Sequence, residues 1–307
     1  RVRRVLKLMK EILILGAGAM GSAFAFPCMD NKHKVTLCEP YNNSLVRKIL
    51  SNRNFHPSLK LNLPKKIIVK KYSNELFKKK WDLVVVAVSS TGIDFVGEKL
   101  KKMKKNNPVL ILTKGLHYQK STQRILTMSE QLSKFIKKGN ISVLKGPCLA
   151  IELANKIKTS AVIANKNIRA AKKVGKLIST NYYKFDYSKD VKGVEICSAI
   201  KNLYSMIIGS GEGLNTASVL FRNSVSEMVY LTKFFKGKEE TVFSLAGLGD
   251  LYVSALGGRN SKMGKYLGKG FTYKRAKKKF MPNDTVEGAQ LALNIAPYIL
   301  KKINNKK

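Results

Sequence analysis

The chain has 307 residues, 44% of them hydrophobic, so it can bury one large core or two ordinary ones and is not a disordered protein. Its 58 Lys and Arg residues against 19 Asp and Glu give a net charge of +39, which favours anionic partners: nucleic acid, acidic lipid or phosphorylated metabolites. No apolar run is long enough to span a bilayer, and the 4 cysteines and 3 histidines lack metal-ligand spacing, so neither a transmembrane segment nor a metal site is expected.

The first residues, 1–8, are basic, and with the apolar and small residues that follow they resemble a signal peptide. The apolar run is short, and the spacing of the glycines that interrupt it has another explanation. Because the chain starts without Met and Met9 precedes the first predicted strand, we expect residues 1–8 to be an extension. The cysteines form no CxxC pair, which favours reduced thiols in the cytoplasm.

Hydrophobic periodicity divides the chain near residues 188–192. Before that point, a strand at 11–15, a helix at 19–28 and a strand at 34–39 open a parallel α/β unit. Strands are also predicted at 67–69, 83–88, 109–112, 141–144 and 161–164. Helices are predicted at 194–208, 217–235, 248–255 and 286–303, with no strand between them. We expect an α/β domain with a doubly wound sheet at 1–190 and an all-α domain at 191–307.

A glycine motif lies between the first strand and the first helix. Gly16, Gly18 and Gly21 form GxGxxG: the first permits a tight turn, the second a close approach of the backbone to a pyrophosphate, and the third close packing of helix and strand. The helix N-terminus offers amides to phosphate groups. A glycine-rich turn without a ligand is the alternative, but this context favours a Rossmann-type dinucleotide site.

Glu39 ends the second predicted strand, 18 residues after Gly21. A carboxylate there accepts hydrogen bonds from the adenosine ribose and repels a 2′-phosphate, which favours NAD over NADP. Two alternatives stay open, since Glu39 could be an ordinary surface residue and nearby Arg47 could meet a phosphate.

Lys201 is the one charged residue between Glu195 and Glu212. A helix that is apolar nearly all round is an interior helix, and burial lowers the pKa of a lysine toward neutrality, where the amine can exchange protons. A lysine at a rim, with only its stem on apolar surface, is the alternative.

Three further groups suit the same chemistry. Lys114 and the Gly146–Cys148 turn each follow a predicted strand, at the sheet edge where open α/β folds bind ligands. Asp250 and Arg259 lie in a pair of glycine-rich turns, where a carboxylate could orient a lysine and a guanidinium could grip a phosphate. Each alone could be a turn with a surface charge.

Taken together, these segments resemble the bacterial NAD(P)-dependent glycerol-3-phosphate dehydrogenases over nearly the whole chain. The lysine helix followed by two glycine-rich turns is more particular than the glycine motif, which many families share. The matching segments, in order, are GAGAMG (16–21), FHPSLKLNLP (55–64), TKGL (113–116), GPCLAIELA (146–154), GVEICSAIKNL (193–203), LAGLGDL (245–251), GRN (258–260) and VEG (286–288).

The resemblance implies an enzyme that interconverts dihydroxyacetone phosphate and sn-glycerol 3-phosphate, the backbone of phospholipids, with NAD or NADP. It implies that Lys201 exchanges the proton at the C2 oxygen and that Asp250 orients Lys201 or a substrate hydroxyl. It also implies contacts of other residues with the substrate and with the cofactor. Substrate contacts would be Lys114, Gly146, Cys148, Asn202, Thr241, Asp250, Gly258, Arg259 and Asn260; cofactor contacts would be Gly16, Gly18, Ala19, Met20, Gly21, Glu39, Lys114, Ala150, Arg259 and Glu287.

The chain departs from the family pattern in several places. Cys148 replaces the usual Ser, Gly258 replaces the Ser before Arg-Asn, and the loops after Gly213 and Asp250 are shorter. Glu39-Pro40 stands where NADP-using members carry a basic residue, in agreement with NAD. Since Lys114, Lys201, Asp250 and Arg259 are retained, we expect an active enzyme.

Two other functions remain open. A related Rossmann dehydrogenase for a hydroxy or keto acid would share the glycine motif and a catalytic lysine, but it would not explain LAGLGDL or Arg259-Asn260. A non-catalytic dinucleotide- or nucleic-acid-binding protein could use the charge; however, the lysine runs lack interleaved aromatic residues, so we expect solvated surface and no specific nucleic acid. Partners would be a small phosphorylated substrate and a second copy in a homodimer. No amphipathic segment indicates membrane contact.

Overall fold

The computed structural model describes residues 8–41, 43–103, 107–119, 121–282 and 284–304. It divides into two compact units. Unit 1 comprises Arg1–Thr113, Ser129–Leu144 and Cys148–Lys189, and unit 2 comprises Lys114–Met128, Lys145–Pro147 and Asp190–Lys307. The segments 114–128 and 145–147 join unit 2 although they precede the predicted boundary, so a single cut in the sequence does not describe the division. Residues 1–7, most of the predicted extension, lie outside the described residues.

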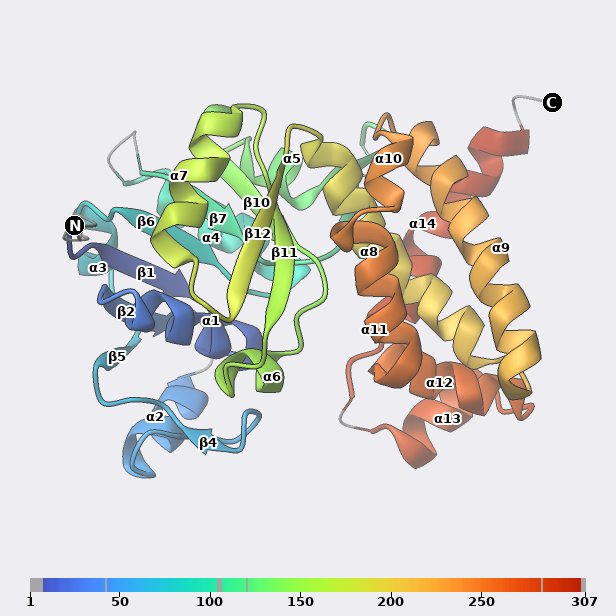
Figure 1. The fold of residues 1–307 in the computed structure, drawn as a ribbon, viewed down its shortest axis with the longest axis horizontal. Helices are drawn as coiled ribbons and strands as arrows, with labels where there is room; N and C mark the ends of the chain where they lie inside the picture. The colour runs from blue at the N-terminus through green and yellow to red at the C-terminus, as the bar shows by residue number, and fades with distance from the viewer. Residues whose placement is uncertain (1–7, 42, 104–106, 120, 283, 305–307) are drawn as a thin grey trace, which may run out of the picture. The chain divides into compact units, whose positions relative to one another are not determined.

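Unit 1 is built on an eight-stranded sheet (Figure 1). Pairs of neighbouring strands run parallel, and Leu15 at the end of the first strand lies opposite both Cys38 and Val86. The carboxyl ends of the central strands therefore meet at one edge of the sheet. In spatial order the strands are β12 (Tyr183–Ser188), β11 (Thr159–Ala164), β10 (Ile141–Lys145), β7 (Val109–Ile111), β6 (Leu83–Val86), β1 (Glu11–Leu15), β2 (Lys34–Glu39) and β5 (Ile67–Lys71).

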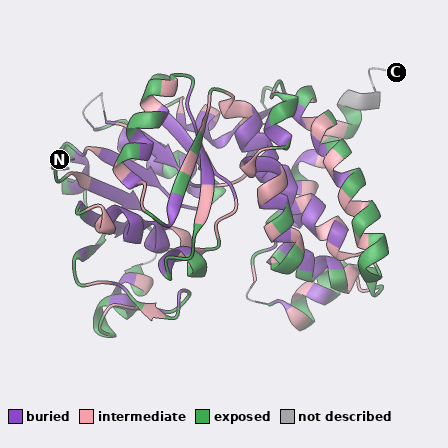
Figure 2. Ribbon diagram, in the orientation of Figure 1, coloured by how far each residue is buried: buried purple, intermediate pink, exposed green. Residues whose placement is uncertain are grey.

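The helices of unit 1 connect these strands and cover the sheet. Side chains of β1, β2, β6 and β11 share one apolar core with α1 and α7, and Figure 2 shows the central strands buried. The remaining short elements connect the strands. The bounds are α1 (Ala19–Asp30), α2 (Asn43–Ser51), β3 (Phe55–His56), β4 (Leu61–Asn62), α3 (Glu75–Lys78), η1 (Ser90–Gly92), α4 (Ile93–Leu100), α5 (Met128–Leu132), η2 (Lys138–Asn140), α6 (Ala150–Ala154) and α7 (Ile168–Ile178).

Apart from one hairpin and Lys145, the last residue of β10, the regular elements described in unit 2 are helices. Helix α8 packs against α9, α10, α11, α12 and α14 and is buried on nearly all sides, as its sequence predicts. Glycines permit its close crossing with α12, because a Cβ at Gly264 would lie 2.0 Å from the carbonyl oxygen of Met206. The bounds are β8 (Leu116–Gln119), β9 (Arg124–Thr127), α8 (Val191–Gly209), α9 (Gly213–Phe234), α10 (Glu239–Val242), η3 (Leu245–Gly249), α11 (Asp250–Gly257), α12 (Arg259–Gly268), α13 (Tyr273–Phe280) and α14 (Glu287–Asn304).

The fold class predicted from the sequence is confirmed: an α/β sheet first, then the helices α8–α14. Periodicity missed β12, the hairpins β3–β4 and β8–β9, and the helices α10, α12 and α13. Most of these are short or polar, and the burial pattern of β12 lacks a clean alternation. No described helix is long and apolar enough to cross a membrane.

Candidate functional site

The glycine motif in unit 1 has the geometry of a phosphate-binding turn. Gly16 has a φ of +111°, and a Cβ there would lie 2.5 Å from the Ala87 carbonyl oxygen. At Gly21 a Cβ would lie 1.9 Å from the Gly16 oxygen, whereas at Gly18 it would meet nothing within 4 Å. The first and third glycines are thus required by packing, and the exposed second one leaves room for a ligand. Helix α1 begins there without a side-chain cap, so its first amides fit a pyrophosphate.

Two buried side chains hold this turn in place. Glu39, at the end of β2, accepts hydrogen bonds from the Ala17 amide (2.9 Å) and the Tyr41 amide (3.0 Å). His56 of β3 bonds the Ala17 carbonyl through Nε2 (2.8 Å) and accepts from the Leu59 amide at Nδ1 (3.2 Å). Since Nδ1 accepts, Nε2 carries the proton, and burial lowers the pKa of His56. The sequence did not single out His56, although it lies in a segment that resembles the family.

An aromatic pair lies beside Glu39. The Tyr41 hydroxyl donates to the Gly92 carbonyl (2.7 Å), which fixes the ring, and the ring centroids of Tyr41 and Phe95 are 5.0 Å apart. Both side chains are exposed on part of their surface. They offer flat apolar area next to the end of β2, a feature that periodicity alone did not reveal.

In unit 2, Asp250 holds two lysines. Nζ of Lys201 donates to Oδ1 at 2.8 Å, and Nζ of Lys114 donates to Oδ2 at 2.7 Å. Lys201 also bonds the hydroxyl of Ser254, one turn after Asp250 on α11. The carboxylate is buried, Lys201 is 5% exposed, and the Lys114 side chain remains a quarter exposed. The prediction that Lys201 is buried is therefore confirmed, and the rim alternative is wrong.

Burial and charge act on these groups in opposite directions. Burial lowers the pKa of Lys201 to about 8, although the neighbouring Asp250 opposes this. Burial would raise the pKa of Asp250, but the charges and hydrogen bonds of Lys114 and Lys201 outweigh it and hold that pKa below its usual value. Asp250 therefore stays ionised while Lys201 can gain and lose a proton near neutral pH.

A second cluster involves the next residue of α8. Nδ2 of Asn202 donates to Glu287 (2.9 Å), and the guanidinium of Arg259 lies 3.6 Å from the same carboxylate. Oδ1 of Asn260 accepts from the Gly288 amide at 2.8 Å. Arg259 is the first residue of α12, and the N-cap before it, Gly258, offers no side-chain cap. A guanidinium and uncapped amides thus lie together at one helix N-terminus.

Some predicted residues lie elsewhere. The Thr241 hydroxyl donates to Asp190, which caps the N-terminus of α8 and belongs to neither cluster. Cys148 and Ala150, the latter being the first residue of α6, pack against the core of unit 1. Gly146, with a φ of +137°, follows β10 directly and belongs to unit 2.

Sequence reasoning missed two residues of unit 2. The signal for Ser254 was its spacing of one helical turn from Asp250. The signal for Lys145, which is buried in unit 2, was a charged residue ending an apolar strand.

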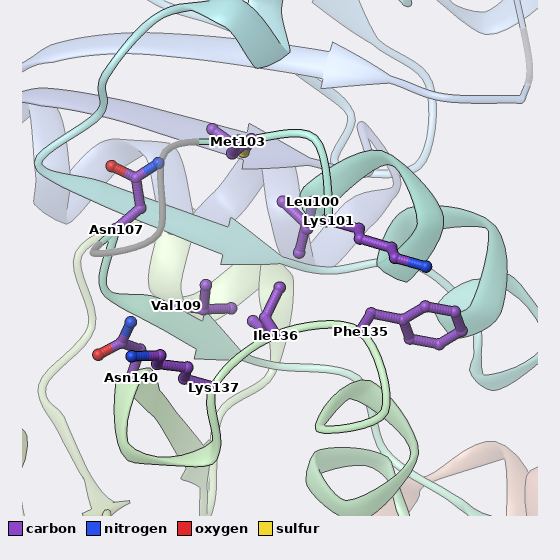
Figure 3. Close-up of a pocket in the computed structure, with 9 residues that line it drawn as sticks. All are labelled: Leu100, Lys101, Met103, Asn107, Val109, Phe135, Ile136, Lys137 and Asn140. Atoms are coloured by element: carbon purple, nitrogen blue, oxygen red, sulfur yellow. The ribbon is translucent and has the colours of Figure 1, made fainter.

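A separate pocket of about 260 Å³ opens in unit 1 at the amino ends of β7 and β10 (Figure 3). Open α/β sheets bind ligands at the carboxyl ends of their strands, so this pocket is not the dinucleotide site. The pocket is lined by Leu100, Lys101, Met103, Asn107, Val109, Phe135, Ile136, Lys137 and Asn140.

Among the described residues, no three His, Cys, Asp or Glu side chains gather to hold a metal ion.

Comparison with known families accounts for both units. Residues 11–171 match the N-terminal part of NAD-dependent glycerol-3-phosphate dehydrogenase, and residues 190–306 match its C-terminal part. The chain belongs to this family. It is accordingly an NAD(P)-dependent oxidoreductase, and the resemblance found in the sequence is confirmed.

Individual members of the family are similar to this chain over most of its length. The glycerol-3-phosphate dehydrogenase [NAD(P)+] of Fusobacterium nucleatum is 30% identical over 290 residues, which cover 91% of this chain and 84% of that protein. The NADP(+)-dependent glycerol-3-phosphate dehydrogenase of Archaeoglobus fulgidus is 29% identical over 86% of this chain and 82% of its own length. The crystal structure of the Coxiella burnetii glycerol-3-phosphate dehydrogenase shares the fold, with a TM-score of 0.84 at 24% identity over 96% of this chain and 90% of that chain.

Proposed function

We propose that this member of the family reduces dihydroxyacetone phosphate to sn-glycerol 3-phosphate, and catalyses the reverse reaction, with Lys201 as the residue that exchanges the proton. The observation that carries the proposal is the pair of lysines on the buried Asp250 carboxylate. A ketone reduction needs one proton at the oxygen, and a lysine with a pKa of about 8 can supply it at neutral pH.

The contacts of Asp250 support a separate role for each residue around it. Lys201, as ammonium, donates its proton to the C2 oxygen and is left as a neutral amine; in the reverse direction the amine takes the proton from the C2 hydroxyl. Asp250 and Ser254 hold the Nζ atom in one position, which preserves the geometry of the transfer. Lys114 keeps a positive charge beside this point and stabilises negative charge that develops on the oxygen.

The phosphate of the substrate fits the start of α12. Arg259 and the uncapped helix amides favour an anion there. Glu287 holds both Arg259 and Asn202, and the bond from Gly288 to Asn260 ties α14 to the same helix. We expect this framework to distinguish a phosphorylated ketone from an uncharged one.

The nicotinamide cofactor, when bound, supplies or accepts the hydride at C2. Gly16, Gly18 and the first residues of α1, Ala19 and Met20, would hold its pyrophosphate. Glu39 would face the adenosine ribose, and its negative charge disfavours a 2′-phosphate, so we infer a preference for NAD. The exposed faces of Tyr41 and Phe95 suit the adenine ring.

Other roles remain predictions drawn from the family. They are cofactor contacts for Lys114, Ala150, Arg259 and Glu287, substrate contacts for Gly146, Cys148, Thr241 and Gly258, the homodimer, and the cytoplasmic location.

A substrate panel tests the reaction. We expect turnover with dihydroxyacetone phosphate and NADH, and an Arg259→Ala variant should raise the KM for that substrate by about 10- to 100-fold, the scale of a lost charge-assisted contact. Arg222→Ala, which removes an exposed arginine from α9, is the matched control. A preference for a non-phosphorylated keto acid, or an unchanged KM in Arg259→Ala, would contradict the proposal.

The cofactor preference has its own test. The kcat/KM of the wild type should be higher with NADH than with NADPH, and Glu39→Gln should narrow the difference because the charge is removed while an acceptor oxygen remains. A wild type that prefers NADPH would contradict the assignment of Glu39 and leave the reaction itself untouched.

A further inference from the structure

The pocket at the amino ends of β7 and β10 contains a buried polar group without a partner. Asn107 lines this pocket, and only 7% of its surface is exposed. Its Nδ2 atom is buried and has no hydrogen-bond partner among the residues that the structure describes. Figure 3 shows this nitrogen on the side of the amide that faces Met103, another lining residue. An unpaired buried donor is destabilising, and an acceptor supplied by a ligand would remove that penalty.

The other walls of the pocket are mostly apolar. Leu100 ends α4, Val109 begins β7, and Phe135 and Ile136 follow α5. Leu100, Met103 and Val109 are buried, while Phe135 and Ile136 are half-buried. A water molecule at the unpaired amide would need at least two polar partners, which these side chains do not provide. The lining therefore fits a ligand that combines an acceptor oxygen with an apolar body.

Contacts between the surrounding elements hold these walls in place. The ring of Phe135 lies directly on Gly97 of α4, where a Cβ would come within 2.3 Å of it. Gln131 of α5 donates a hydrogen bond to Asp94 of α4. Nδ2 of Asn165, which follows β11, donates to the first carbonyl of β10 at 2.9 Å. A ligand would therefore meet a pocket that is already formed, as is usual for small-molecule sites.

The charge and the size of the pocket narrow the class of ligand. Lys101 and Lys137 line it, both are exposed, and no carboxylate is among the described lining residues. A rim with positive charge alone favours an anion. The volume of about 260 Å³ is below the range of about 300–1,000 Å³ that is typical of drug-sized ligands, so the ligand is small.

We propose that this pocket binds a short aliphatic carboxylate of about the size of octanoate. Nδ2 of Asn107 donates to an oxygen of the carboxylate, the apolar walls cover the hydrocarbon chain, and the lysines of the rim favour the negative charge. The site belongs to unit 1 throughout and takes no part in the proposed reaction.

The first test is the binding of octanoate, measured by saturation-transfer NMR, to the wild type and to Asn107→Leu. The wild type should bind with a Kd of about 5 mM or tighter, the scale for a ligand this small. Asn107→Leu should weaken binding at least about 10-fold, the effect of a lost hydrogen bond to a charged group. Its melting temperature should equal or exceed that of the wild type, because an unpaired buried donor is removed. A purely structural role of Asn107 would lower it.

Matched controls separate the pocket from the rest of the surface. Asn62→Leu makes the same change at an exposed position of β4 and should bind octanoate like the wild type. Ile136→Trp fills the pocket from a half-buried position and should abolish binding, and this variant decides the matter if Asn107→Leu does not fold. All three variants should bind NADH like the wild type, which shows that unit 1 is folded.

A second ligand tests the part of the lysines. Octanamide keeps an acceptor oxygen and lacks the charge. The joint replacement of Lys101→Met and Lys137→Met should therefore weaken octanoate binding by about 2- to 5-fold, the scale of exposed charges, and leave octanamide binding unchanged.

Three outcomes would overturn the proposal. One is a folded wild type that shows no octanoate binding at about 20 mM. The second is binding that neither Asn107→Leu nor Ile136→Trp weakens, which would place octanoate elsewhere on the protein. The third is an equal loss of octanoate and octanamide binding in the double lysine variant, which would exclude recognition of the charge. Each of these outcomes would leave the proposed reaction intact.

Discussion

At the scale of the residue, one carboxylate organises the site. Asp250 gives each of its oxygens to a different lysine, and this arrangement fixes Lys201 while burial keeps its pKa near neutrality. The sequence predicted the buried lysine because a single charge stood in an apolar helix. It could not predict that Lys114 and Lys201 share Asp250, since the three residues are far apart in the chain.

Ser254 and Lys145 show the limit of reading motifs. A serine in a helix and a lysine at a strand end are common, and only burial and contacts distinguish these two. Thr241 is the opposite case: the family resemblance assigned it to the substrate, while its hydroxyl bonds the cap of α8.

The titration of Lys201 predicts opposite pH profiles for the two directions. Ketone reduction requires the ammonium form, so kcat should fall as pH rises through about 8; oxidation of glycerol 3-phosphate requires the neutral amine, so kcat should rise through the same pH. Steady-state rates in both directions at saturating substrate measure this. Profiles that move in the same direction would exclude Lys201 as the group that exchanges the proton.

At the scale of the element, β1, the glycine turn and α1 are packed so closely that their backbone has little freedom to move. Gly21 lies against the backbone of Gly16, and Glu39 and His56 hold Ala17 from two further elements. The sequence predicted the strand, turn and helix because their periodicity and glycine spacing are local. It did not predict the part of His56, because β3 is only two residues long and no periodicity marks it.

Replacement of Gly21 by Ala tests this packing. The added Cβ must displace the backbone, so we expect a loss of about 1–3 kcal/mol in unfolding free energy, the usual cost of overpacking, and weaker NADH binding. Gly139→Ala is the matched control, because a Cβ there meets nothing within 4 Å. Thermal unfolding and NADH titration by fluorescence measure both effects, and a Gly21→Ala protein that binds NADH like the control would contradict the account.

His56 predicts an acid limit for the same turn. Its folded pKa is lowered by burial, so the unfolded chain binds more protons and stability must decrease as pH falls below about 6.5. In a His56→Gln variant this part of the pH dependence should be absent. Unfolding curves between pH 5 and 7 for both proteins measure the difference, and parallel curves would show that the His56 titration is not linked to folding.

At the scale of the whole molecule, the net charge of +39 both destabilises the folded state and attracts anions. Like charges repel one another in the folded state, while the same field draws in anionic substrate and cofactor. The sequence predicted the α/β sheet and the helical second part, since both rest on long periodic segments. It did not predict that the hairpin β8–β9 belongs to unit 2, which depends on contacts distant in sequence.

Ionic strength separates the two effects of the charge. Raising NaCl from about 0.05 to 0.5 M shortens the Debye length severalfold, so the melting temperature should rise by a few degrees and the KM for dihydroxyacetone phosphate should increase. Potassium chloride at equal concentration should act alike, because screening does not depend on the cation. A melting temperature that falls with salt would contradict net repulsion in the folded protein.

The most direct test of the central claim is the oxidation of NADH with dihydroxyacetone phosphate by the wild type and by Lys201→Ala, after both proteins have been shown to fold and to bind NADH. We predict turnover by the wild type and a loss of about 10²- to 10⁴-fold in kcat for the variant, the range of general acid–base catalysis. An active Lys201→Ala enzyme, or a folded wild type that binds NADH and leaves dihydroxyacetone phosphate unreduced, would contradict the account.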